Sequence, residues 1–351
     1  MTAKAIRFVI SATFACAAWG QTPAGPGVQK VFSFTYTDTP RGMQEILNTM
    51  RAITEVQQAT VDNAARTMTL GGTANQLALA GWLLPQLDRP SQPPAQPSQS
   101  PSTLEYRLAG SADAVARVFY LTHTPTPQGM QEIINSIRSI LEVQRVVANN
   151  ALQAVVLRGT AAQVAASEWL INGLDKPAGV QPVSSQGQSS TLAYTLSDAY
   201  DPRSLAPAVR VFYLANTPNP QGMQEIVNSV RSLGDIQRVA GSNGPMAITV
   251  RGTADQAAMA AWLINALDKP AGVAAASPGQ TPAAIQYQMA GSGDVARVFY
   301  PHTSTPQELQ DLVNQVRSTV GIQRAVSYSA TGALALRGTA GQVAMAEKLI
   351  Q

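Results

Sequence analysis

Two hydrophobic periods alternate along the chain, and the stretch that begins at Val209 shows both of them. Residues 209–214 read Val-Arg-Val-Phe-Tyr-Leu, a β-branched and aromatic run that predicts a strand. Asn219-Pro220 then places a capping residue before a proline, which is the usual start of a helix. Apolar residues follow from Met223 to Leu233 at spacings of three and four, so one face of this helix meets a core.

A strand pair and a second helix complete the unit. Residues 236–240 and 247–251 predict two strands around the turn sequence Gly-Ser-Asn-Gly-Pro. Gly252-Thr253-Ala254-Asp255-Gln256 predicts a capping box, in which the Thr oxygen and the Gln side chain each bind the other residue's main-chain N–H. The second helix ends at Leu267-Asp268, because Pro270 cannot continue it.

The same unit occurs four times. The glycine of the Arg/Gly-Gly-Thr-Ala motif lies at Gly72, Gly159, Gly252 and Gly338, roughly 90 residues apart, which suits a small domain with a linker. The capping box recurs in each copy, as Thr73/Gln76, Thr160/Gln163, Thr253/Gln256 and Thr339/Gln342. The predicted fold class is α+β, with four tandem β-α-β-β-α modules in which two helices cover one face of a small sheet.

Linkers rich in Pro, Ser, Gln and Ala separate the units. We predict the following division: signal peptide 1–20, module 1 at 28–90, linker 91–103, module 2 at 104–177, linker 178–191, module 3 at 192–270, linker 271–284 and module 4 at 285–351. We expect each module to close its own hydrophobic core. The chain stops before the Leu-Asp-Lys-Pro ending of the other copies, so the last helix of module 4 is expected to fray or to be cut short.

An extra strand is expected at the start of modules 2, 3 and 4. Each begins with an apolar-x-Tyr-x-apolar pattern, at Leu104-Tyr106-Leu108, Leu192-Tyr194-Leu196 and Ile285-Tyr287-Met289. This period of two is typical of an edge strand, either added to the following module or shared with the preceding one.

The first twenty residues predict export. Lys4 and Arg7 precede an apolar stretch that ends in small residues, the order of a signal peptide, with cleavage expected after Gly20. The stretch is too short for a membrane anchor, so no transmembrane segment is expected after cleavage. Cys16 raises the alternative of a lipoprotein, but the residues before it do not form a lipobox.

Charge and cysteine content exclude several classes of function. The charged fraction is 13%, and the chain has 24 basic and 21 acidic residues. Without Lys4 and Arg7 the basic residues number 24 − 2 = 22 and exceed the acidic ones by only one. The electrostatic drive for nucleic-acid binding is therefore missing. Cys16 is the only cysteine, so disulfides and thiol chemistry are not expected in the mature chain.

The order of elements and the Leu-Asp-x-Pro endings resemble the small N-terminal (N1/NolW-like) periplasmic modules of bacterial secretins. The matching endings are 87–90, 174–177 and 267–270. The resemblance implies a periplasmic or outer-membrane location, and modules that stack into rings or dock other envelope proteins. It does not extend to the secretin channel domain, for which no segment here has the alternating strands.

Polar residues recur on the first helix of every module at positions i, i+4 and i+7. They line one side, next to the apolar stripe, and are interpreted either as a solvated helix edge or as a hydrogen-bonding seam for a neighbouring module or subunit. We call these residues the helix ladder: Gln44, Asn48, Arg51, Gln131, Asn135, Arg138, Gln224, Asn228, Arg231, Gln310, Asn314 and Arg317.

Three tryptophans occupy one repeated position on the second helix. Trp82, Trp169 and Trp262 lie on the side away from the predicted core, and module 4 has Lys348 there. Three at one position predict a contact, with the next module, another subunit or an external partner.

Catalytic, cofactor and metal sites are not predicted. His123 and His302 are the only histidines, and neither has a second ligand at metal-binding spacing. The sequence therefore predicts a non-enzymatic structural protein that makes protein-protein contacts in a secretion or pilus-type assembly of the cell envelope. The alternative is a soluble exported protein that binds a cell-surface polymer or ligand through several weak sites.

Overall fold

The computed structural model describes residues 28–90, 105–110, 112, 114–177, 190–197, 200, 206–217, 219–270, 286–301 and 305–350. The predicted signal peptide with Cys16, linkers 91–103 and 271–284, and His302 lie outside these ranges. Linker 178–191 enters them only at residues 190 and 191, where a strand has already begun.

The elements follow the predicted order. Module 1 contains β1 (Val28–Ser33), α1 (Pro40–Thr54), β2 (Gln58–Asp62), β3 (Thr67–Gly72) and α2 (Ala74–Leu87). Module 2 contains β4 (Glu105–Arg107), β5 (Val115–Tyr120), α3 (Pro127–Leu141), β6 (Arg145–Asn149), β7 (Ala154–Gly159) and α4 (Ala161–Leu174). Module 3 contains β8 (Ser190–Thr195), β9 (Ala208–Tyr213), α5 (Pro220–Gly234), β10 (Arg238–Ser242), β11 (Ala247–Gly252) and α6 (Ala254–Leu267). Module 4 contains β12 (Gln286–Gln288), β13 (Val295–Phe299), α7 (Pro306–Val320), β14 (Arg324–Tyr328), β15 (Ala333–Gly338) and α8 (Ala340–Ile350).

Each module has one antiparallel sheet. The order is β1-β3-β2 in module 1 and β4-β5-β7-β6 in module 2, and modules 3 and 4 repeat the four-stranded order. The α+β fold class and the arrangement in four tandem modules are confirmed. The predicted extra strands are also present, because β4, β8 and β12 pair antiparallel with β5, β9 and β13 of the following module.

The capping box explains the repeated glycine. Thr160 Oγ1 accepts from the N–H of Gln163, and the Gln163 side chain accepts from the N–H of Thr160 at 3.0 Å. The same side chain folds over Gly159, where a Cβ atom would lie 2.7 Å from Gln163 Oε1. The cap and the glycine therefore depend on each other, and equivalent pairs occur in all four modules.

The Asp of the Leu-Asp ending joins the second helix to the loop before the first. The Asp268 carboxylate accepts from the main-chain N–H groups of Ala215, Asn216 and Thr217 at 2.6 to 2.9 Å. Asp88 and Asp175 bind the corresponding loops of modules 1 and 2. The motif thus stabilises each module internally.

The expectation that every module closes its own core is wrong. The helices of module 2 share one hydrophobic cluster with Val209, Val211 and Tyr213 from the sheet of module 3. Two further clusters join module 1 to module 2 and module 3 to module 4 in the same way. Because neighbouring strand residues point to opposite faces, the sheets of modules 2 to 4 bury one face on their own helices and the other on the preceding pair.

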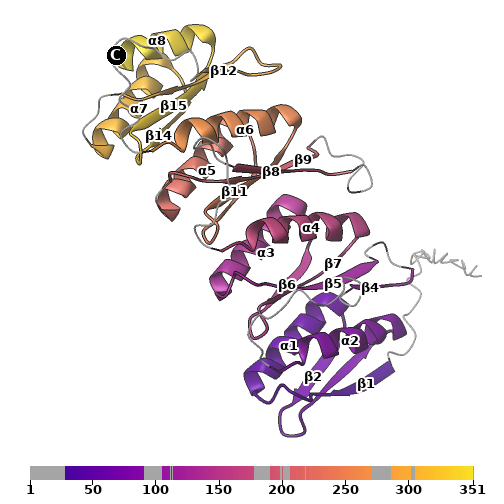
Figure 1. The fold of residues 1–351 in the computed structure, drawn as a ribbon. Coiled ribbons are helices and arrows are strands. Elements are labelled where there is room, and N and C mark those ends of the chain that lie inside the picture. Colours follow the sequence, from indigo (N-terminus) through magenta and orange to yellow (C-terminus); the bar gives the residue numbers. More distant parts are fainter. Residues whose placement is uncertain are drawn as a thin grey trace, which may run out of the picture.

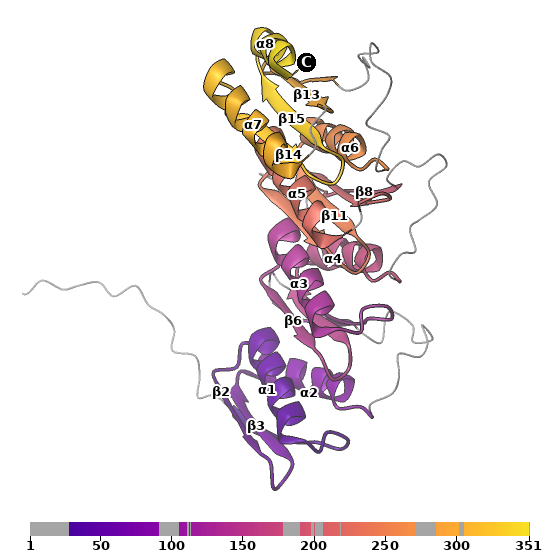
Figure 2. The ribbon, with the colours of Figure 1, turned by 90° about the vertical axis from the view of Figure 1, so that its left-hand side faces the viewer.

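The four modules therefore form one column (Figure 1). The first helices α1, α3, α5 and α7 follow one another along one side of it (Figure 2). The sheet of module 1 forms one end of the column, and the helices α7 and α8 form the other.

Candidate interaction surface

The contact between successive modules is built from the same residue positions at each of the three junctions. Each tryptophan of the second helix packs on the tyrosine of the next module's edge strand. The ring centroids are 5.6 Å apart for Trp82 and Tyr106, and the pairs Trp169/Tyr194 and Trp262/Tyr287 are 5.1 and 5.5 Å apart. All three contacts are tilted, a geometry that aromatic pairs favour.

An acid at the end of the first helix binds two arginines of the next module. Glu55 accepts from Arg145 at 2.6 Å and from Arg158 at 3.2 Å. Glu142 binds Arg238 and Arg251 in the same way, and Asp235 binds Arg324 and Arg337. We call each such group an arginine clamp.

The acid of each clamp has a left-handed backbone. The φ angles are 60° at Glu55, 54° at Glu142 and 53° at Asp235. This conformation ends the helix and is uncommon for residues other than glycine and asparagine. A side chain is therefore kept at a position where glycine would be easier to accommodate, which indicates that the carboxylate matters at the junction.

The inner arginine of each clamp is buried and makes a second contact. Arg251 is 2% exposed, and its Nη1 donates to the main-chain oxygen of Ile140 at 3.0 Å. Arg158 and Arg337 donate to Ile53 and Leu233. These carbonyls belong to the last turn of a helix, where no intrahelical partner exists. Burial lowers the pKa of Arg158, and the nearby Glu55 partly offsets that effect.

Two further contacts complete each junction. A glutamate in the middle of the first helix accepts from the hairpin turn of the next module, as Glu132 does from the N–H of Asn243 at 2.7 Å. A tyrosine at the end of the strand that follows the next module's edge strand donates to the end of the second helix, as Tyr213 of β9 does to the oxygen of Gly173 at 2.6 Å. Burial raises the pKa of Tyr213 to about 12, and that of the equivalent Tyr300 also to about 12.

The helix ladder residues bind within their own module. In each module the Gln side chain donates to the Asn four residues later, at 2.9 to 3.4 Å. The Arg donates to a main-chain oxygen of the adjacent edge strand, as Arg138 does to Val146 at 2.6 Å. The Gln and Asn side chains remain at the surface, so these bonds hold the ladder in place without covering it.

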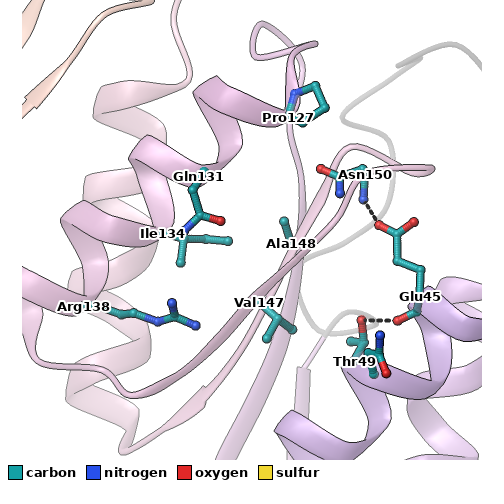
Figure 3. Close-up of a pocket in the computed structure, with 10 residues that line it drawn as sticks. Glu45, Thr49, Pro127, Gln131, Ile134, Arg138, Val147, Ala148 and Asn150 are labelled. Atoms are coloured by element: carbon teal, nitrogen blue, oxygen red, sulfur yellow. Dashed lines mark hydrogen bonds between the residues drawn. The ribbon is translucent and has the colours of Figure 1, made fainter.

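A pocket of 360 Å³ lies between modules 1 and 2 and brings ladder residues of both together. Asn48 reaches it from α1, and Gln131 and Arg138 reach it from α3. Figure 3 shows Gln131 and Arg138 directed toward Val147 and Ala148 of β6, with Glu45 bound to the turn at Asn150. The tryptophans do not join this pocket, since they lie at the junctions on the second helices.

The repeated tryptophans were predicted to make a contact, whereas the arginine clamps were not predicted from the sequence. A signal for the clamps was present. Arg158, Arg251 and Arg337 precede the Gly-Thr motif in modules 2 to 4, whereas module 1 has Gly71 there. The acids end the first helix in modules 1 to 3, whereas module 4 has Gly321.

Metal and membrane sites do not add to this picture. In the part of the chain that the structure describes, no three His, Cys, Asp or Glu side chains are grouped to hold a metal ion. None of the described helices is long and apolar enough to cross a membrane.

Comparisons with known proteins found similarity at the level of solved structures. No family model and no curated protein matches the chain. The N-terminal domain of the secretin XcpQ from Pseudomonas aeruginosa is 13% identical, with 42% of this chain and 62% of that chain covered and a TM-score of 0.18. Aeromonas hydrophila ExeD is 15% identical, with 69% and 41% covered and a TM-score of 0.16. The type II secretion system secretin GspD of E. coli K12 is 12% identical, with 70% and 39% covered and a TM-score of 0.15.

These structural neighbours include secretin N-terminal domains, the group that the Leu-Asp-x-Pro motif had suggested. The chain spans less than two thirds of the length of the XcpQ domain structure and about 40% of the ExeD and GspD chains. A protein of unknown function from Aeropyrum pernix, APE0754, is also similar, at 12% identity and a TM-score of 0.21.

Proposed function

We propose that this chain is a non-enzymatic scaffold of secretin-N-like repeats, which makes protein-protein contacts in a secretion or pilus-type assembly at the periplasmic or outer-membrane side of the envelope. The observation that carries the proposal is that three equivalent junctions join the four modules into one column. Because the junctions use the helix faces and the sheet faces, the long sides of the column are left for partners.

The side that carries the helix ladder suits association between copies. Gln and Asn amides donate and accept, so the amide positions of two like ladders can bind each other without charge repulsion. The ladder arginines already donate to main-chain oxygens of their own modules. The ladder repeats in all four modules along the row of first helices (Figure 2). Many weak contacts at a fixed spacing add up to a strong one when both partners are held in register.

The chemistry of the ladder also favours binding over catalysis. Amides do not titrate near neutral pH, and a guanidinium stays protonated. General acid or base catalysis needs a group whose pKa lies near the operating pH. The buried junction tyrosines have raised pKa values, so they do not supply such a group.

Light scattering after size exclusion tests the proposal on the chain without residues 1–20. We expect a discrete oligomer that lateral contacts hold together. The variant Gln44→Glu/Gln131→Glu/Gln224→Glu keeps the size of each side chain but places three negative charges along the ladder. The Gln side chains donate to the Asn oxygens, so in the variant each Asn amide must turn to donate to the new carboxylate, which only accepts. We expect this variant to dissociate to monomers at the same concentration, since like charges then face each other.

The matched control is Gln57→Glu/Gln144→Glu/Gln237→Glu. These exposed residues also recur once per module and follow the helix, so the variant carries the same charge change at another place. It should keep the oligomer. A wild-type chain that is monomeric at about 100 μM would contradict lateral assembly and favour the alternative of a multivalent binding protein.

A further inference from the structure

Each end of the column has residues equivalent to those that form the three internal junctions. At both ends, these residues differ in type from the ones at the internal junctions. At the internal junctions the outward sheet face has an apolar centre, which in module 2 includes Val118 at 0% exposure. The strand register places Val31 at the same position of module 1, where it is 60% exposed. The residues around it in module 1 are polar: Gln29, Ser33, Gln58, Thr60, Asp62, Thr67 and Thr69.

Module 1 lacks both arginines of the clamp. Gln58 stands where Arg145 stands in module 2, and Gly71 stands where Arg158 stands. The Gln58 side chain covers Gly71, since a Cβ atom there would lie 2.7 Å from Gln58 Oε1. Gln29 Nε2 donates to the same oxygen at 3.2 Å. A neutral amide pair thus occupies the place where the next modules present two cations.

Module 4 lacks the acid of the clamp. Gly321, with a φ angle of 76°, ends α7 where Glu55, Glu142 and Asp235 end the first helices of the other modules. Thr319 is exposed at the position where Ile140 is buried, and the exposed Lys348 replaces the tryptophan. Met345 is 54% exposed, whereas Met259 at the same position is fully buried under module 4.

The edge strand also belongs to the junction. The β8 strand forms hydrogen-bonded pairs with β9 of its own module, but Leu192 and Tyr194 pack on the core of module 2. Tyr106 and Tyr287 pack on the preceding module in the same way. In the described residues module 1 has three strands, so an approaching helix pair would find no tyrosine there.

We infer that the outward sheet face of module 1 and the outer helix face of module 4 do not dock to each other when two copies of this chain meet. A docked end would bury Thr60 and Thr67 without a partner, at positions where the docked modules have Val or Ala, and it would lack every charge of the clamp. This prevents an open-ended contact of one end with the other, which would otherwise produce filaments. Copies are left to associate through their long sides.

Cysteine crosslinking tests this inference directly. The chain without residues 1–20 has no cysteine, so an introduced pair is the only one. Asn63 and Asp311 occupy the positions of Asn243 and Glu132, which touch each other at an internal junction. We expect Asn63→Cys in one copy and Asp311→Cys in another to form no disulfide above the level seen with a cysteine on the column side, for example at Gln144.

Restoring the junction residues should create the contact. In the Asn63→Cys chain the added changes are Ser33→Tyr, Gln58→Arg, Thr60→Val, Thr69→Val and Gly71→Arg. In the Asp311→Cys chain they are Thr319→Leu, Gly321→Glu and Lys348→Trp. We expect the mixed restored pair to crosslink at least about tenfold more than the unmodified pair, and to lose most of that gain when Gly321 is kept, because the acid then is missing from the clamp.

A second measurement covers the case in which the restored chains fail to fold, as judged by circular dichroism. Glu142→Gly places at an internal junction the residue type that ends the first helix of module 4, Gly321. Glycine accepts the left-handed backbone there without strain. We expect faster hydrogen exchange at β8 and β9 than in wild type, with α1 and α2 unchanged. Efficient crosslinking of the unmodified ends, no crosslinking of folded restored chains, or unchanged exchange in Glu142→Gly would each overturn the inference.

Discussion

At the scale of single residues, the junctions show how a buried charge is kept satisfied. The Arg251 side chain is fully buried and binds both Glu142 and the main-chain oxygen of Ile140. A buried ion pair adds stability only when its hydrogen bonds are complete, because desolvation of both charges is costly. The free carbonyl at the helix end supplies the missing acceptor. The same helix end therefore provides both the acid and the carbonyl that the arginine needs.

A buried threonine in the same sheet offers a prediction. Thr249 faces module 2, is 0% exposed, and its hydroxyl has no partner among the described residues, whereas module 2 has Val156 at this position. Thr249→Val should stabilise the protein by about 1 kcal/mol, since an unpaired buried hydroxyl is removed at nearly constant shape.

The matched control is Thr217→Val. The Thr217 hydroxyl donates to Asp268 at 2.8 Å in a buried site. Its removal should destabilise the protein by about 1 to 3 kcal/mol, because the carboxylate loses a partner. Denaturant unfolding of both variants measures the difference, and equal losses would contradict the assignment.

At the scale of elements, strand and helix ends hold neighbouring modules together. The edge strand is tied to one module by main-chain hydrogen bonds and to another by its side chains. The neighbouring strand β9 also contacts the preceding module, because Tyr213 at its end donates to the oxygen of Gly173 in the last turn of α4. Of the two alternatives for the edge strand, the strand pairing confirms the first, because the strand is added to the following module. Its contact with the preceding module is made by side chains.

The tyrosines predict how stability depends on pH. Burial raises the pKa of Tyr213 to about 12, from about 10 for an exposed tyrosine. Between these values the folded chain holds a proton that the unfolded chain has lost, so stability falls as pH rises from about 10 to 12. Tyr213→Phe should be less stable than wild type at pH 9, and the gap should narrow toward pH 12. Denaturant unfolding at several pH values measures the gap, and parallel curves would contradict this origin.

At the scale of the whole molecule, shared cores couple the modules. Three of the hydrophobic clusters contain residues of two modules. Removing one module would expose apolar surface of the next, as in a linear repeat array. The modules are therefore not four independently folded domains joined by linkers, as the sequence had led us to expect.

Calorimetry distinguishes the two descriptions. We expect the wild-type chain to unfold with a van't Hoff enthalpy larger than that of one module of about 60 residues, because neighbouring modules unfold together. Glu142→Gly should split or broaden the transition by uncoupling modules 2 and 3. A wild-type transition whose van't Hoff enthalpy equals that of a single module would argue for independent beads.

Local signals explain why the elements were predictable. A cap, a proline and an apolar stripe lie within about fifteen residues of one another, and they decide the start, the end and the buried face of a helix. Thr126, for example, accepts from the N–H of Gly129 at the start of α3. The helix ladder was found for the same reason, since its spacing is a property of one helix.

The sequence by itself determined the four β-α-β-β-α units and their capping boxes, because each depends on a repeated local pattern. Only the tertiary structure decided that each sheet packs on the preceding helix pair and that Trp169 meets Tyr194. Those contacts join residues such as Glu142 and Arg251, about a hundred positions apart, and no local period encodes which outward face will be covered. Whether a residue on an outward face is buried or exposed can be decided only when the neighbouring face is known.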